Sequence, residues 1–306
     1  MKKYNIFLSI LVVYILLNMF LYPSLYMQMT FDGISAWTFN VLPSVLPFMF
    51  FTKVLAITGF TEKIGYVFSR PCKKLFKTPP SSAYVFFMSI ISGYPVGAKI
   101  TADLFESGKI SRNDALKMTS FCSTSGPMFI IGAVGTGMLG NTTWGYIIFI
   151  SHVLGALFNG LLYRNLKTKE IYENNTSLIG PKQDLSAMIY DSVISILSIG
   201  AIIAIFFVVI TSLSPIFDLF SPQISSVLKG IIEITKGCID ISHLSGILFK
   251  ITACTFVISF GGISTILQSL TMLDKLRMPI KLFVLQKITH AIFATITSLP
   301  LCLILI

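Results

Sequence analysis

The sequence predicts an all-α polytopic membrane protein with about six to eight transmembrane helices, two glycine-broken or re-entrant segments and an inverted repeat. Three observations support this fold class. Of the 306 residues, 54% are hydrophobic and only 12% are charged, and mean hydropathy is +0.81; a soluble domain carries roughly 25% charged residues. Several apolar runs are long enough to cross a bilayer. Glycines interrupt two of these runs, around residues 92–99 and at 261–262.

Composition also restricts the kind of partner and site. A chain this apolar is not a soluble enzyme. The net charge of +10 is typical of basic cytoplasmic loops and contact with anionic lipid, so no nucleic acid is expected. The five cysteines are scattered without a CxxC pair, which argues against a disulfide framework and a zinc site. No metal and no cofactor are expected.

The N-terminal stretch predicts an uncleaved membrane anchor, residues 1–30. Lys2 and Lys3 precede an apolar run over residues 4–22. The run is too long for a signal peptide, and no small-residue cleavage pattern follows. We therefore expect the N-terminus in the cytoplasm and Asp32 in a short outside loop.

The next apolar stretch, residues 37–60, predicts a second span that Pro43 and Pro47 would kink. A basic stretch without acidic residues follows it. By the positive-inside rule we expect this stretch to be a cytoplasmic loop; its cations are Arg70, Lys73, Lys74 and Lys77.

The most unusual stretch begins where the apolar run 84–91 stops at Ser92. Glycine permits positive φ and proline removes an amide donor, so no helix continues smoothly through it. At membrane depth, broken backbone is tolerated only where it is buried in protein or lines a wet cavity. We therefore predict a substrate site, with an ordinary interhelical loop as the alternative. Its residues are Ser92, Gly93, Tyr94, Pro95, Gly97 and Lys99.

A second polar stretch opens the apolar segment that follows. Before it, Ser111 with Asp114 three residues on predicts a capped, short amphipathic helix at the membrane surface. Hydroxyls and free amides at a helix start attract anions, so we add this stretch to the site. Close helix packing by small residues is the alternative. The residues are Ser123, Thr124, Ser125 and Gly126.

The remainder of the chain completes two repeats around a polar linker. The first repeat, 31–163, ends with a linking span at 143–163 that contains His152. A lone histidine in such a span is more often a packed or hydrogen-bonded group than a proton relay. The linker, 164–186, is expected in the cytoplasm. The second repeat, 187–306, opens with a span at 187–213 and closes with one at about 281–306.

The second repeat supplies its own charged and broken segments. Within residues 227–240, Lys229 and Glu233 are four apart, as are Lys236 and Asp240, so each pair could neutralise itself on one helix face. The predicted site residues from this half are Glu233, Thr235, Gly261, Gly262 and Ser264.

Short similarities relate the two halves. Residues 91–101 match 258–268, and residues 55–59 match 232–237. One intervening span would reverse the second half, as in inverted-repeat transporters. Lys275, Arg277 and Lys281 would then fall outside, contrary to the positive-inside rule.

The segment SGYPVGAKIT, followed by SGPMFIIGAVG, resembles the sporulation integral membrane proteins of the YlbJ (SpoVV) family, which are related to the nucleoside-recognition or Gate-domain membrane proteins. The resemblance extends from about residue 42 to the C-terminus. It implies a multi-pass protein of the cell membrane, in the outer forespore membrane of endospore-forming bacteria. It also implies a part in moving dipicolinic acid from mother cell to forespore.

Three hypotheses are weighed. The first is a transporter or facilitator for a small organic anion, dipicolinic acid, with a nucleoside-type permease as an alternative. The second is a non-transporting sporulation scaffold. The third, an intramembrane enzyme, is not expected, because the three histidines lie in separate segments with no metal-ligand spacing. The expected partners are the anionic substrate, the lipid bilayer and, in a homo-oligomer, a second copy. We expect Lys99 to contribute to anion binding, unless it reaches the surface or pairs with Asp103.

Overall fold

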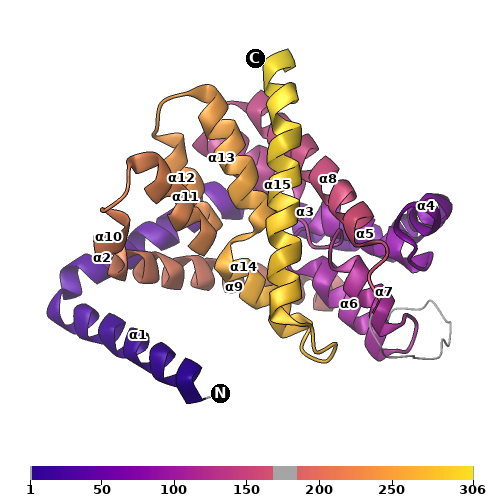
Figure 1. Ribbon diagram of the computed structural model, residues 1–306, viewed down its shortest axis with the longest axis horizontal. Helices are drawn as coiled ribbons and strands as arrows, with labels where there is room; N and C mark the ends of the chain where they lie inside the picture. The colour runs from indigo at the N-terminus through magenta and orange to yellow at the C-terminus, as the bar shows by residue number, and fades with distance from the viewer. Residues whose placement is uncertain (1, 168–184, 306) are drawn as a thin grey trace.

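The computed structural model describes residues 2–167 and 185–305, and within these ranges it is all-helical (Figure 1). Most of the linker predicted at 164–186 therefore lies outside the described residues. The described helices that are long and apolar enough to cross a membrane are Pro23–Thr52, Thr142–Tyr163, Ser192–Ser212, Ile247–Met272 and Ile280–Leu305. Shorter apolar helices cover Leu8–Leu21, Ser81–Ser92 and Met128–Met138. The predicted all-α polytopic fold is therefore confirmed.

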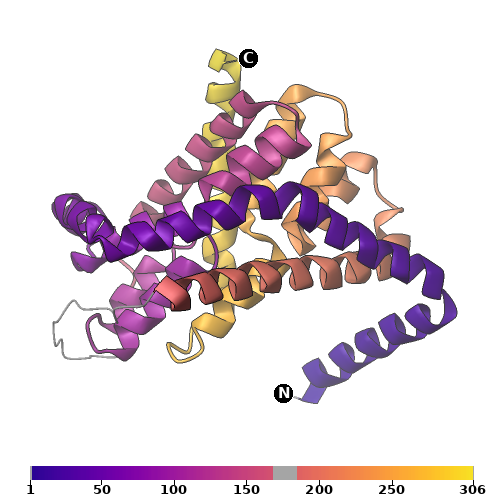
Figure 2. The same ribbon diagram turned by 180° about the vertical axis from the view of Figure 1, so that it is seen from behind.

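After α1 (Lys2–Leu21), the chain forms a long helical rod. The rod consists of α2 (Pro23–Ala36) and α3 (Leu42–Ile57), which are joined by the π-helix η1 (Trp37–Val41). Figure 2 shows the rod beside α9 (Leu185–Ser212) across the back of the molecule. The predicted loop at Asp32 is wrong, because this residue lies within α2. Gly33 next to it permits a close approach to α9, where a Cβ atom would lie 2.8 Å from the Ala204 Cα.

The basic stretch predicted as a loop is instead a helix, α4 (Phe60–Phe76), bounded by Gly59 and Lys77 in left-handed conformations. Its apolar and basic residues separate onto two faces. Cys72 and Phe76 are buried, while Lys73 and Lys74 are exposed in the last turn, where the helix dipole favours cations.

The first glycine break forms the tip of a helical hairpin, as predicted for a re-entrant segment. Its arms are α5 (Ser81–Ser92) and α6 (Val96–Glu106), and Gly93 between them has φ of 74°. The arms lie close together near the tip, since a Cβ on Gly97 would lie 2.7 Å from the Ser89 side chain.

After the hairpin the chain forms a short helix and then leaves helical geometry. The helix α7 (Arg112–Met118) starts at Ser111, whose Oγ accepts a hydrogen bond from the Asp114 amide at 3.1 Å, as the sequence predicted. Residues 119–126 are non-helical. They lead into the π-helix η2 (Met128–Met138) and then α8 (Thr142–Tyr163), which matches the predicted linking span.

The second half contains a hairpin that the sequence did not predict. After α9 and the short α10 (Ser214–Phe217), its arms are α11 (Pro222–Ile232) and α12 (Ile234–Ser242), with Glu233 extended between them. The predicted Lys229–Glu233 pair is therefore wrong, because the helix breaks at Glu233. Lys229 lies 3.4 Å from Asp240 instead, and the predicted Lys236–Asp240 pair forms at 2.6 Å.

A broken helix and a final span follow this hairpin. They are α13 (Ile247–Phe260) and α14 (Gly262–Met272), separated at Gly261, and then α15 (Ile280–Leu305). The predicted break at Gly261 and Gly262 is confirmed, because both have positive φ, at 91° and 64°.

The structure relates the two halves differently from the sequence matches. Each half has a hairpin, a break and a long span, in that order. The tip of the first hairpin, at Gly93, lies against Gly126 in the first break; the tip of the second lies against Gly262 in the second break. The counterpart of the Gly93 tip is thus the Glu233 tip, and the sequence match of 91–101 with 258–268 paired a hairpin with a break.

Candidate functional site

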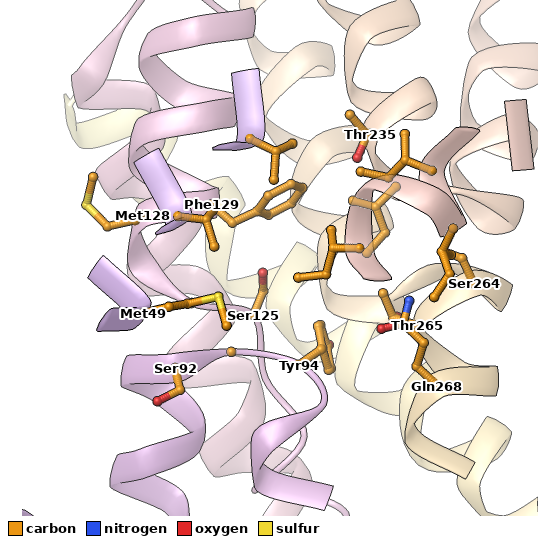
Figure 3. Close-up of a pocket in the computed structure, with 18 of the residues that line it drawn as sticks. Met49, Ser92, Tyr94, Ser125, Met128, Phe129, Thr235, Ser264, Thr265 and Gln268 are labelled. Carbon is orange, nitrogen blue, oxygen red and sulfur yellow. The ribbon is translucent and has the colours of Figure 1, made fainter. Parts of the chain in front are cut away.

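A central cavity lies where both hairpin tips and both breaks meet (Figure 3). Its volume is about 90 Å³, several times the roughly 10–15 Å³ that one water needs. The apolar part of its wall comes from α3, η2 and α9, with Met49, Phe129 and Ile203 among the residues. The polar lining residues are Ser92, Tyr94, Ser125, Glu233, Thr235, Ser264, Thr265 and Gln268.

Four helix starts border this cavity. Tyr94 precedes α6, Gly126 precedes η2, Thr235 lies in the first turn of α12, and Ser264 in that of α14; all four residues line the cavity. Helix N-termini carry partial positive charge and free N–H groups. The starts of α6, η2 and α14 can therefore attract negative charge without a lining lysine or arginine, whereas the Glu233 carboxylate already caps the start of α12.

The non-helical segment 119–126 is held in place from several sides. The Thr124 amide donates to Ser89 Oγ at 3.2 Å, and the Asn159 side chain donates to the Ser120 carbonyl at 2.7 Å. Buried backbone groups need such partners. The segment thus keeps its shape through contacts with α5 and α8, which positions Ser125 and Gly126 at the cavity.

His152 on α8 is one of these supports. Its Nε2 accepts a hydrogen bond from the Ser125 amide at 2.9 Å, so the ring proton is on Nδ1, which lies 2.8 Å from Ser259 Oγ. His290 on α15 lies beside it, with Nε2 3.0 Å from the His152 carbonyl. The prediction that His152 is a hydrogen-bonded group is confirmed.

Glu233 brings a carboxylate to the cavity wall. The residue is only 3% exposed, and its Oε2 accepts a hydrogen bond from the Lys236 amide at 2.8 Å, which caps α12. Ser264, which also lines the cavity, is 2% exposed, and its hydroxyl has no hydrogen-bond partner in the described part of the chain. The cavity therefore offers one acidic acceptor and one unused hydroxyl.

Lys287 on α15 is the buried cation nearest the first hairpin tip. Its Nζ donates to Tyr94 Oη and to the Ser123 carbonyl, both at 2.7 Å, and lies 4.3 Å from the centre of the Tyr94 ring. Through Tyr94, the ammonium is one side chain away from the cavity.

The structure brings together about half of the predicted site residues. Those that line the cavity are Ser92, Gly93, Tyr94, Ser125, Gly126, Glu233, Thr235 and Ser264. Those that do not are Pro95, Gly97, Lys99, Ser123, Thr124, Gly261 and Gly262.

The residues outside the cavity have other positions. Thr124 bonds Ser89 at 2.7 Å, and a Cβ on Gly97 would overlap the Cys122 carbonyl, so these residues pack the hairpin. Lys99 is exposed on α6. Its nearness in sequence to Gly93 did not bring it to the cavity, because one turn of α6 rotates its side chain away.

Sequence reasoning missed Lys287, Thr265, Gln268 and the apolar wall. Lys287 occupies the middle of an otherwise apolar span, and an intramembrane cation is a functional candidate by default. The position of Lys287 within this apolar span could therefore have identified it from the sequence. The wall residues of α3 and α9 carry no comparable signal, because each belongs to an ordinary apolar run.

Comparison with known proteins agrees with this architecture. A family model described as Gate, nucleoside recognition, matches residues 38–142. The chain is 26% identical to the sporulation integral membrane protein YlbJ of Bacillus subtilis (strain 168) over 314 residues, 90% of this chain and 77% of that protein. The resemblance predicted from the sequence is confirmed.

Two solved structures share the fold. A variant of CNTnw in an outward-facing state aligns with a TM-score of 0.65, covering 99% of this chain and 86% of that one. CNTnw in an inward-facing substrate-bound state aligns at 0.57, covering 97% and 85%. Both are 13% identical to this chain, so the likeness is one of fold. The chain is thus a multi-pass membrane protein that shares the fold of CNTnw.

Proposed function

We propose that this chain is a transporter or facilitator that moves a small organic anion, dipicolinic acid, across the outer forespore membrane during endospore formation. The observation that carries the transport part is the central cavity between two hairpin tips and two breaks. A scaffold does not need such breaks, whereas transporters bind their substrates at discontinuous helices. The similarity to a sporulation membrane protein supports the setting.

An anion suits the electrostatics of the cavity. Dipicolinate carries two carboxylates near neutral pH, and burying them without partners would be very costly. The starts of α6, η2 and α14 each supply a partial positive charge, whereas the Glu233 carboxylate already caps the start of α12. Ser264, with its unused hydroxyl, provides a donor at the cavity wall.

A nucleoside-type permease is the second candidate, and Glu233 favours it. A carboxylate at the wall can accept hydrogen bonds from the hydroxyls of a neutral sugar, but it repels a dianion. The Gate family model, whose description is nucleoside recognition, points the same way.

Uptake into proteoliposomes that contain only this protein separates the candidates. We expect labelled dipicolinate to enter faster than into protein-free liposomes, and excess unlabelled dipicolinate, but not uridine, to compete. Gly97→Val, which overlaps the Cys122 carbonyl, is the inactive control. Uptake of labelled uridine without dipicolinate uptake would establish the permease instead, and uptake of neither would favour the scaffold.

The proposed function also implies which partners surround the protein, namely the lipid bilayer and, in a homo-oligomer, a second copy. The lipid bilayer covers the many exposed apolar side chains of α1, α2 and α9. A second copy in a homo-oligomer remains compatible with this surface. A fluorescent fusion imaged during sporulation should mark the membrane around the forespore.

A further inference from the structure

We infer that the Lys287 ammonium is the counter-ion for a carboxylate of the transported anion. This inference rests on the proposed function, and it assigns to Lys287 the anion-binding role that was expected of Lys99. Among the described residues, the hydrogen-bond partners of Lys287 Nζ are two neutral groups, the Tyr94 hydroxyl and the Ser123 carbonyl. The anion would bring the charge that these two partners lack.

Lys287 is buried without an acidic partner in the described part of the chain. The residue is 2% exposed and lies in the middle of α15. Among the described residues, no carboxylate lies within salt-bridge distance of its Nζ. Buried charges in proteins are normally paired, because an isolated one is costly. An unpaired buried lysine favours the uncharged amine, so a carboxylate that binds beside Lys287 would also stabilise a proton on its Nζ.

Lys287 and Ser123 have hydrogen-bonding groups that their neighbours do not use. An ammonium has three N–H groups, and Tyr94 and Ser123 accept two of them. The Ser123 hydroxyl next to this site is buried and has no partner among the described residues. One ammonium proton and one hydroxyl are therefore available to a carboxylate.

Tyr94 controls whether a substrate in the cavity can reach Lys287. Tyr94 both lines the cavity and bonds Lys287, so the tyrosine side chain separates the ammonium from the substrate space. The second break packs closely against both side chains, since a Cβ on Gly261 would lie 3.2 Å from Lys287 Cε and 3.3 Å from Tyr94 Oη. A rotation of Tyr94 would open the path between ammonium and cavity.

Titration calorimetry on the purified full-length chain tests the inference with two probes of the same shape, dipicolinate and the neutral pyridine-2,6-dicarboxamide. We expect wild type to bind dipicolinate at least about tenfold more tightly than the dicarboxamide, since hydrogen bonds to charged groups are the stronger ones. Lys287→Gln and Lys287→Met should lose about tenfold or more in dipicolinate affinity and leave dicarboxamide affinity unchanged. Methionine needs no hydrogen-bond partner, so this variant avoids a buried unpaired amide.

Lys99→Gln is the matched control, because it removes the same charge from an exposed position on α6, and it should bind dipicolinate like wild type. Unchanged dipicolinate affinity in a folded Lys287 variant would overturn the inference while the proposed function stands. Equal wild-type affinity for the two probes would overturn it without any variant. Binding of neither probe would overturn the dipicolinate assignment and this inference with it.

Discussion

Gly93 and Gly97 lie four residues apart in one hairpin, but different constraints apply to them. Gly93 has φ of 74°, and a Cβ there would lie 2.7 Å from the Gly126 amide nitrogen. Gly97 has ordinary helical geometry within α6, where alanine would be favoured by about 1 kcal/mol. The overlap with the Cys122 carbonyl outweighs that preference, because a backbone atom cannot move aside as a side chain can.

We predict that Gly93→Ala impairs the protein far more than Gly108→Ala. Both glycines have positive φ, 74° and 69°, which residues with a Cβ rarely adopt. With ψ of −170°, Gly93 also lies in a region that is essentially restricted to glycine. Only Gly93 has backbone in the path of the new Cβ; Gly108 has no atom within 4 Å. Thermal unfolding in detergent and dipicolinate uptake measure the difference. Equal behaviour of the two variants would mean that the hairpin tip tolerates displacement.

At the scale of elements, each hairpin depends on small residues beside its tip. Ser89 faces Gly97 in the first hairpin, and Gly230 faces Gly237 in the second. The second hairpin adds an ion pair between its arms, Lys229 with Asp240 at 3.4 Å. Short arms packed this closely can support a tip at the centre of the protein, where broken backbone lines the cavity.

We predict that Gly237→Ala destabilises the second hairpin. The new Cβ would overlap the Gly230 Cα, and forced packing costs about 1–3 kcal/mol, more than the gain of about 1 kcal/mol from helix propensity. Gly137→Ala is the control, since its Cβ would meet only ordinary contacts at 3.4 Å. The melting temperature should fall for Gly237→Ala and stay or rise for Gly137→Ala. A rise for both would show that the arms can separate freely.

At the scale of the whole molecule, basic residues from both halves gather at one end. The Lys77 side chain donates to Asn165 at 2.7 Å, and Lys117 donates to the Lys77 carbonyl at 3.2 Å. Arg112, on the same short helix as Lys117, donates to the carbonyls of Leu276 and Arg277. The positive-inside rule would place this end in the cytoplasm.

This arrangement removes a difficulty of the sequence-based topology, in which Lys275 and Arg277 fell outside. Lys275 instead pairs with Glu106 of the first half at 2.6 Å. The hydrogen bond from this exposed lysine to Glu106 raises the pKa of Lys275 above its ordinary value. The second half therefore presents its basic loop on the same side as the first.

We predict that Lys74→Cys and Asp274→Cys, each in a cysteine-free background and expressed in the cell membrane of non-sporulating cells, resist an impermeant thiol reagent added outside intact cells. Ser245→Cys should react, because it precedes the apolar stretch Ile247–Met272, which separates it from Asp274. All three positions are exposed. Labelling of Lys74→Cys and Asp274→Cys on opposite sides would contradict the common basic end.

Features that depend on neighbouring residues could be predicted from the sequence. Apolar composition gave the membrane class, Gly93 and Gly261 marked two breaks, and Ser111 marked a helix start, because each acts through backbone conformation or hydropathy within a few residues. Eight cavity residues were named on this basis. Asp32 and the basic residues of α4 were misassigned to loops, since packing against α9 and α5 decides that these segments are helical.

Only the tertiary structure decided which charges lie at the centre. Glu233 was expected to pair with Lys229 on one helix, but the break at Glu233 turns its carboxylate to the cap of α12 and to the cavity. Lys99 is near the first break in sequence and exposed in space, whereas Lys287 reaches Ser123 across 164 residues. Contacts between segments so distant depend on how the hairpins and spans pack together, and no local pattern records that packing.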